Sequence, residues 1–151
     1  MSIEVGSPVE GLAAPLSDVP DPVFSQAMVG PGIAVKPKAG PSDAVAPIAG
    51  KVATLHPHAF VVASDAGVAI LVHLGIDTVK LDGAGFTLHV AKNEVVAAGQ
   101  RIASWDSAEI ESKGYASMCP VVALDAAAET VSDIRDDGAV MPGDVVFLAG
   151  G

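Results

Sequence analysis

The chain has 151 residues, a length that suits a single domain with its own hydrophobic core. Acidic residues outnumber basic ones by 18 to 8, and the formal net charge of −10 excludes nucleic acid and anionic membrane surfaces as default partners. A single cysteine excludes an internal disulfide, and no cationic start followed by an apolar run indicates a secretory signal. We expect one cytoplasmic domain over residues 1–151, with residues 1–10 as a flexible N-terminus and no direct membrane insertion.

Short apolar segments bounded by Gly, Pro, Asp or Asn follow one another along the chain and predict β-strands. Residues 12–30, which precede them, are expected to be irregular and to lie on the surface, because Pro20 and Pro22 prevent regular strand pairing. The predicted strands are residues 32–37, 50–55, 59–63, 68–73, 86–90, 101–105, 120–124 and 145–148.

Two short helices are also expected. Glu109 follows Asp106 by three positions, a pattern typical of a helix N-terminus, and predicts a helix to about Lys113. Residues 126–132 form a second candidate, although β-branched residues there disfavour a helix. Only 4% of the residues are aromatic, so the core must consist mainly of Val, Ala, Leu and Ile. These features predict an all-β domain, a compact antiparallel β-sandwich or barrel with short peripheral helices.

Three of the four histidines, His56, His58 and His73, lie in one otherwise apolar stretch. If residues 59–63 and 68–73 pair as a hairpin, His58 at the start of one strand lies opposite His73 at the end of the other. Two imidazoles that close disfavour double protonation, so at neutral pH at least one is neutral and nucleophilic. The arrangement favours a functional site over two ordinary strand-end histidines.

A metal site remains an alternative for the same stretch. His56 and His58 form a His-x-His pair, and His73 with Asp77 forms His-x-x-x-Asp. Two or three His with one Asp suffice for a catalytic zinc with an open position. Both elements resemble motifs of lysostaphin-like zinc endopeptidases, in which they occur in the opposite order. A zinc-dependent hydrolase that uses all four residues is therefore the second hypothesis, and a non-catalytic regulatory binding module is the third.

A set of motifs in one order resembles a known family, the glucose-family enzyme IIA domain of the bacterial phosphoenolpyruvate-dependent sugar phosphotransferase system. The motifs are residues 20–24, 29–34, 46–50, 58–60, 72–79 and 119–122, and the match runs from about Val9 to Leu148. The resemblance implies a β-sandwich like the duplicated hybrid motif and a phosphotransferase component that requires no cofactor. A zinc ion bound by His58 and His73 remains an alternative.

The resemblance also implies roles for individual residues. His73 would accept a phosphoryl group from the histidine-containing phosphocarrier protein and pass it to a cysteine of the enzyme IIB domain of a sugar permease. A neutral imidazole suits this task because it is both a good nucleophile and a good leaving group. His58 would stabilise the phosphoryl oxygens, and the backbone carbonyl of Gly75 would orient the His73 ring. His56 stands where several family members carry Thr, and it either assists the site or faces solvent.

For partner docking, the resemblance implies an apolar recess with an acidic rim. The apolar positions are Val23, Phe24, Phe60, Ile70 and Val72. Asp21 and Asp77 match acidic positions that meet arginines of the phosphocarrier, and the negative net charge would steer such a basic partner. Cys119 has an apolar setting with no flanking base, so we expect a buried structural cysteine.

Overall fold

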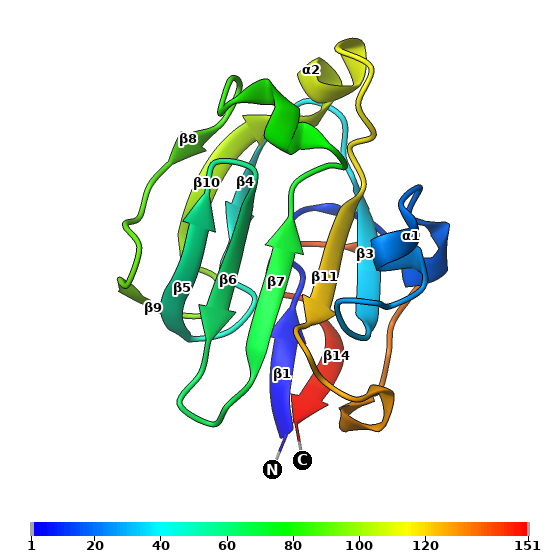
Figure 1. Cartoon of the computed structure of the whole chain (residues 1–151), viewed down its shortest axis with the longest axis vertical. Helices are drawn as coiled ribbons and strands as arrows, with labels where there is room; N and C mark the ends of the chain where they lie inside the picture. Colours follow the sequence, from blue (N-terminus) through cyan, green and yellow to red (C-terminus); the bar gives the residue numbers. More distant parts are fainter. Residues whose placement is uncertain (1, 151) are drawn as a thin grey trace.

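The computed structural model describes residues 2–150, and most of its regular structure is β-strand (Figure 1). The elements in chain order are β1 (Ser2–Gly6), β2 (Gly11–Pro15), η1 (Leu16–Asp18), α1 (Pro22–Ser25), β3 (Gly32–Pro37), β4 (Pro41–Val45), β5 (Gly50–His56), β6 (Ala59–Ala63), β7 (Ala69–His73), η2 (Thr78–Leu81), β8 (Thr87–Leu88), β9 (Val95–Val96), β10 (Arg101–Asp106), α2 (Ser107–Ser112), β11 (Cys119–Ala123), η3 (Ala128–Thr130), β12 (Val131–Ser132), β13 (Ala139–Val140) and β14 (Val145–Gly150).

The strands form one large sheet and two small ones. The large sheet has eight strands in the order β13-β2-β3-β11-β7-β6-β5-β9, and the small sheets have the orders β1-β14-β12 and β4-β10-β8. Strand pairing within residues 2–150 is antiparallel throughout. Figure 1 shows the large sheet in front, with β1 and β14 and with β4 and β10 behind it. The predicted all-β antiparallel sandwich with short peripheral helices is confirmed.

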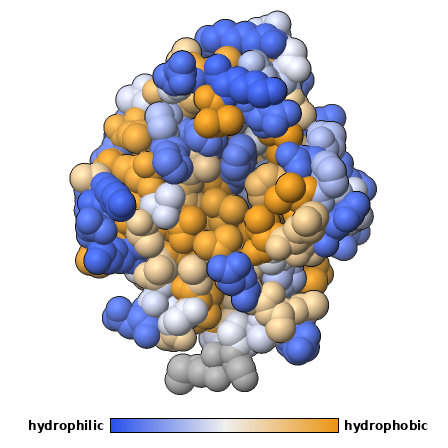
Figure 2. All heavy atoms as spheres, viewed as in Figure 1, coloured by the Kyte–Doolittle hydropathy of each residue, from blue (hydrophilic) through white to orange (hydrophobic). Residues whose placement is uncertain are grey.

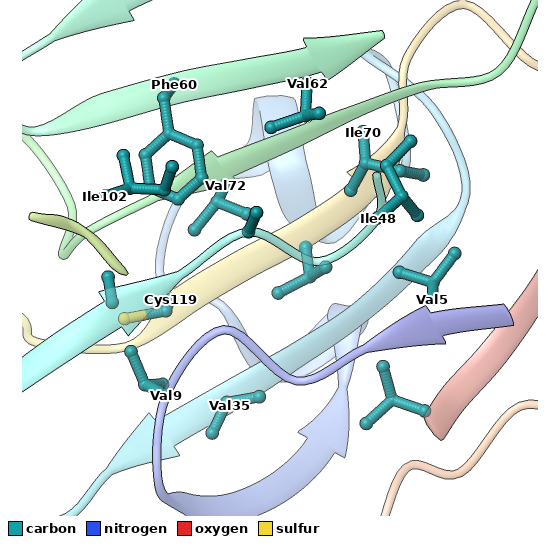
Figure 3. Packing of buried hydrophobic residues seen from close by; sticks show 14 of the residues in the cluster. Val5, Val9, Val35, Ile48, Phe60, Val62, Ile70, Val72, Ile102 and Cys119 are labelled. Carbon is teal, nitrogen blue, oxygen red and sulfur yellow. The ribbon is translucent and has the colours of Figure 1, made fainter. Parts of the chain in front are cut away.

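The main core fills the space between the large sheet and the smaller ones. Every second side chain of β6 and β7 points into it, including Phe60, which is 1% exposed, and Val72, which is 0% exposed. Figure 3 shows these side chains directed toward Ile48, Ile102 and Val5 on the opposite side. Branched aliphatic side chains fill most of this layer, as the low aromatic content predicts.

Residues 2–6 form the strand β1, in contrast to the flexible segment expected over residues 1–10, of which Met1 lies outside the described residues. Strand β1 pairs with β14 at the other end of the chain, with Val5 opposite Phe147. Val5 and Val9 are both 0% exposed. Backbone pairing and the burial of apolar side chains together hold this segment.

The segment 12–30 is also more regular than predicted. Strand β2 pairs with β3 and β13 and ends at Pro15, opposite Ile33, whereas Pro20 and Pro22 stand outside the ladder. Pro22 occupies the first turn of α1, where a helix needs no backbone N–H, and the Asp21 carboxylate accepts the Val23 N–H at 2.9 Å. Phe24 is 8% exposed, so the segment is packed rather than loosely wrapped.

The two predicted helices have different outcomes. Helix α2 forms where expected, and the Asp106 carboxylate accepts the N–H groups of Ala108 and Glu109 at 3.0 and 3.2 Å. Residues 126–132 instead form the single turn η3 and the short strand β12, which pairs with β14. Their β-branched residues suit a strand better than a helix. The strand predicted over 86–90 shrinks to β8, and strands β1, β2, β4, β9, β12 and β13 were not predicted.

Candidate active site

His58 lies in the turn that joins β5 to β6. His56 pairs with Ala59, so Pro57 and His58 are the two connecting residues. The ring of Pro57 fixes its φ near the value that the first turn position needs. The backbone carbonyl of His58 accepts the N–H of Leu74 at 2.7 Å, which ties this turn to the chain that leaves β7.

His73 is the last residue of β7 and lies directly opposite Ala59. The prediction that His58 itself stands opposite His73 is therefore wrong by one residue. The two imidazoles nevertheless meet, with ring centroids 5.1 Å apart and an interplanar angle of 66°. His58 can reach across because it stands in the turn rather than in the ladder.

A hydrogen bond sets the tautomer of His73. Nδ1 of its ring contacts the backbone carbonyl oxygen of Gly75. A carbonyl only accepts, so Nδ1 carries the proton and Nε2 keeps a free lone pair. Gly75 has φ +82°, a backbone conformation that side-chain-bearing residues rarely adopt.

Both imidazoles of the pair are neutral at physiological pH. Burial, then repulsion by His73 and by His56, lowers the pKa of His58 from 6.5 to about 4. Burial also lowers the pKa of His73, against the opposing effects of the Gly75 hydrogen bond and the carboxylates of Asp21 and Asp77. The site thus presents one neutral nucleophilic nitrogen, Nε2 of His73, beside a neutral imidazole.

His56 is exposed and extends the cluster outward. Its ring stacks on His58, with centroids 5.7 Å apart and an interplanar angle of 22°. Within residues 2–150, no group of three or more His, Cys, Asp or Glu side chains is close enough to hold a metal ion. The zinc ligands proposed from the sequence, which include Asp77, are not assembled as one set.

Figure 2 shows an apolar patch on the front of the molecule. Apolar side chains of η1, α1, β3, β7 and β11 pack together outside the main core, and we call them the outer apolar cluster. Its buried members are Leu16, Val19, Phe24, Ala34, Ile76 and Val122, and its partly buried members are Val29, Leu71, Ala116 and Met118. Phe24 of this cluster lies against His73, with ring centroids 5.4 Å apart.

Three residues predicted for the docking recess lie in the main core instead. Phe60, Ile70 and Val72 are 1%, 0% and 0% exposed, so no partner can touch them in this conformation. Side chains alternate along β7, so Leu71 shares the outer face with His73, whereas Ile70 and Val72 point the other way. Of the predicted recess, Phe24 borders the site and Val23, at 42% exposed, offers its side chain to a partner.

The two predicted acidic residues lie close enough to His73 to influence its charge, since both carboxylates favour its protonated form. Asp21 is half-buried at the start of α1, and Asp77 is exposed with φ +61°. Cys119 is fully buried, and burial raises the pKa of its thiol to about 12, so it is no nucleophile at neutral pH.

The family model described as the phosphoenolpyruvate-dependent sugar phosphotransferase system, EIIA 1, matches residues 3–128. The chain belongs to this EIIA family. Its members take a phosphoryl group from the histidine-containing phosphocarrier protein and pass it to an EIIB domain, so the resemblance seen in the sequence is confirmed. Neither the zinc-hydrolase hypothesis nor the purely regulatory module is supported by this membership.

Individual relatives agree with the family assignment. The chain is 42% identical over 120 residues to the glucose-specific EIIA component of Oceanobacillus iheyensis, a match that covers 80% of this chain and 73% of that protein. It is 43% identical over 125 residues to the mannose-specific EIIBCA component of Corynebacterium glutamicum, covering 83% of this chain but 18% of that longer protein.

The fold matches a solved EIIA structure along nearly its whole length. Glucose permease IIA from Mycoplasma capricolum superposes with a TM-score of 0.90 and 35% identity, covering 98% of this chain and 96% of that one. Within residues 2–150 no helix has both the length and the apolar content that crossing a bilayer requires.

Sequence reasoning missed several residues on the outer face of the large sheet, which His73 shares, above all Leu71, Val61 and Met118. Leu71 and Val61 pair across β7 and β6 on the same face as His73. The signal was available, because residues two positions apart along a strand share a face. Counting back from His73 in steps of two selects Leu71, not Val72 or Ile70.

Proposed function

We propose that His73 holds the phosphoryl group of this phosphoryl carrier, attached at Nε2. As an EIIA component the chain works in sugar uptake and forms a phosphohistidine. The observation that carries the choice of atom is the hydrogen bond from His73 Nδ1 to the Gly75 carbonyl. Because Nδ1 is thereby protonated, Nε2 is the ring nitrogen with an available electron pair.

Each transfer step forms one bond to phosphorus and breaks another. The electron pair of His73 Nε2 forms the new P–N bond while the P–N bond of the phosphocarrier breaks, and its electron pair returns to the donor imidazole. In the second step the thiolate of the EIIB cysteine attacks phosphorus, and the electron pair of the P–N bond returns to Nε2. The proton stays on Nδ1, hydrogen-bonded to the Gly75 carbonyl oxygen, throughout.

His58 is proposed as the residue that stabilises the transferring phosphoryl group. Its ring lies 5.1 Å from that of His73, centroid to centroid, and is neutral, so it can donate one N–H to a phosphoryl oxygen. His56 is proposed as an auxiliary that acts through His58, because it stacks on that ring and faces solvent.

Docking is proposed to use Val23 and the partly buried members of the outer apolar cluster, with Asp21 and Asp77 as an acidic rim. Exposed carboxylates beside an apolar patch steer a basic partner and allow it to leave after transfer. The EIIA family indicates no cofactor. Zinc at the His58 and His73 pair is tested directly by metal analysis of the purified protein and by the effect of a chelator on transfer.

The deciding experiment is intact mass spectrometry after incubation with phosphoenolpyruvate and the two general phosphotransferase proteins. The wild-type protein should gain one acid-labile phosphoryl group, with or without chelator, and His73→Gln should gain none. His58→Gln should still accept the group but pass it on about 100-fold more slowly, the typical effect of losing one such donor. His89→Gln, an exposed histidine outside the site, is the matched control. Phosphorylation of His73→Gln would refute the assignment.

A further inference from the structure

Thr78 is a buried polar residue in the segment that follows the phosphoryl-accepting histidine. Its side chain is 0% exposed, and it begins the turn η2. The hydroxyl Oγ1 donates to the backbone carbonyl of Leu74 at 2.8 Å. A buried hydroxyl is costly unless it makes such a bond, so the contact fixes the geometry between these two residues.

The Leu74 carbonyl belongs to the peptide group that enters Gly75, and its oxygen accepts the Thr78 hydroxyl proton. Because a peptide group is planar and rigid, this bond restrains the orientation of the whole group, up to the Gly75 nitrogen.

The peptide group that leaves Gly75 is held at both ends. Its oxygen accepts a hydrogen bond from His73 Nδ1, and its N–H, which belongs to Ile76, donates to the carbonyl of Ala116 at 2.9 Å. Hydrogen bonds therefore restrain both peptide groups beside Gly75, and His73 is bound to one of them.

The methyl group of Thr78 contacts Gly75 as well. A Cβ placed on Gly75 would lie 2.7 Å from Thr78 Cγ2, so the methyl fills the space beside the glycine. Thr78 thus restrains Gly75 twice, through the hydroxyl on the preceding peptide group and through the methyl against its Cα.

We propose that Thr78 is a positioning residue for phosphoryl transfer, which holds the Gly75 carbonyl where it selects the His73 tautomer with a free Nε2. The proposal rests on the proposed function, since it concerns the nitrogen at which His73 is phosphorylated. Thr78 touches neither the phosphoryl group nor the imidazole, and it acts through the backbone of Gly75.

The test compares Thr78→Val, which keeps the shape and loses the hydroxyl, with Thr78→Ser, which keeps the hydroxyl. Ring ¹⁵N shifts report the tautomer of His73 in the unphosphorylated protein, and NMR of the phosphorylated protein reports whether phosphorus is on Nδ1 or Nε2. Thr78→Val should show mixed tautomers, some Nδ1 phosphorylation and transfer slower by roughly tenfold, as is usual when a supporting hydrogen bond is lost. Thr78→Ser should keep the wild-type tautomer and the Nε2 attachment.

Ser7→Ala is the matched control, because the buried Ser7 hydroxyl donates to the Val9 carbonyl at 2.7 Å, far from the histidines in sequence. This variant should lose stability without changing the His73 shifts. The proposal is overturned if Thr78→Val keeps one Nδ1–H tautomer and the wild-type rate. If Thr78→Val does not fold, Thr78→Ala replaces it, since it also lacks the hydroxyl, and a single Nδ1–H tautomer with the wild-type rate in that variant overturns the proposal. Failure of the wild-type protein to become phosphorylated on His73 would instead refute the proposed function.

Discussion

The imidazole rings of His58 and His73 meet edge to face, with centroids 5.1 Å apart, although Ala59 rather than His58 pairs with His73 in the sheet. The turn position of His58 makes this contact possible. Since each protonated ring would repel the other, the pair is most stable when both rings are neutral. His73 then offers a lone pair at Nε2, and His58 keeps an N–H that, in its proposed role, donates to the phosphoryl oxygens.

The first prediction concerns the titration of His58. The chemical shifts of its ring protons should stay nearly constant from pH 8 to about pH 5 and should titrate with a midpoint near pH 4. Burial and the neighbouring His73 disfavour the charged form of the ring. In His56→Ala the pKa should rise, since one repelling imidazole is removed, but by less than in His73→Gln. NMR titration measures all three. A wild-type midpoint near 6.5 would contradict the assigned environment.

The same pKa shift predicts how stability depends on pH. The unfolded chain binds a proton at His58 below pH 6.5, whereas the folded protein does so only near pH 4. The contribution of His58 to the free energy of unfolding is therefore full above pH 6.5 and is lost as the pH falls from 6.5 to about 4. Urea denaturation should show a weaker pH dependence in His58→Gln across this interval. If the free energy of unfolding of His58→Gln depends on pH as it does in the wild-type protein, His58 is not the source of that dependence.

The third prediction concerns partner docking through Val23. Val23→Asn removes an apolar side chain that is 42% exposed beside the site, and it should raise the KM for the phosphocarrier roughly three- to tenfold with little change in kcat. Val145→Asn is the control, because Val145 has a similar exposure of 40% but lies in the small sheet at β14. Transfer kinetics at equal protein stability measure the effect. Equal KM values in the two variants would remove Val23 from the docking surface.

Much of the site could be predicted from local sequence. Val-rich runs between turn residues located β6 and β7, and the spacing of Asp106 and Glu109 located the start of α2. Family motifs indicated His58, His73 and Gly75, which the structure brings together. These features depend on neighbouring residues or on motifs, which are visible in the sequence.

The register of the hairpin could not be predicted, because it depends on the conformation of its loop. Ser64 Oγ accepts the N–H groups of Ala66 and Val68, both at 3.2 Å, and five residues rather than four separate the strands. A shift of one residue in the register changes which side chains face the core. Strand β1 was missed for a related reason, since its pairing with β14 joins the two ends of the chain and leaves no local signal.

The fourth prediction concerns the charge of Asp77. Asp77→Asn keeps a side chain that tolerates the φ of +61° and removes a carboxylate that favours protonated His73, so the pKa of His73 should fall further. Association with a basic phosphocarrier should slow a few-fold at low salt and change little at high salt. Asp82→Asn, at φ +51° and also exposed, is the control. The rim assignment fails if both variants slow transfer equally or if the salt dependence is unchanged.

The last prediction concerns Gly75. Gly75→Ala would place a Cβ 2.7 Å from Thr78 Cγ2 and 2.9 Å from the Ala116 carbonyl oxygen, so the loop must shift and the Gly75 carbonyl must move away from His73. Gly67→Ala is the matched control, with φ +84° and no atom within 4 Å of the added methyl. The control should cost about 1 kcal/mol of unfolding free energy for the backbone conformation alone. Gly75→Ala should cost roughly 2–4 kcal/mol and should lose the single His73 tautomer, because steric strain adds to the same backbone cost. Urea unfolding and ¹⁵N shifts of His73 measure both effects, and equal stability losses with an unchanged tautomer would show that Gly75 does not orient the His73 ring.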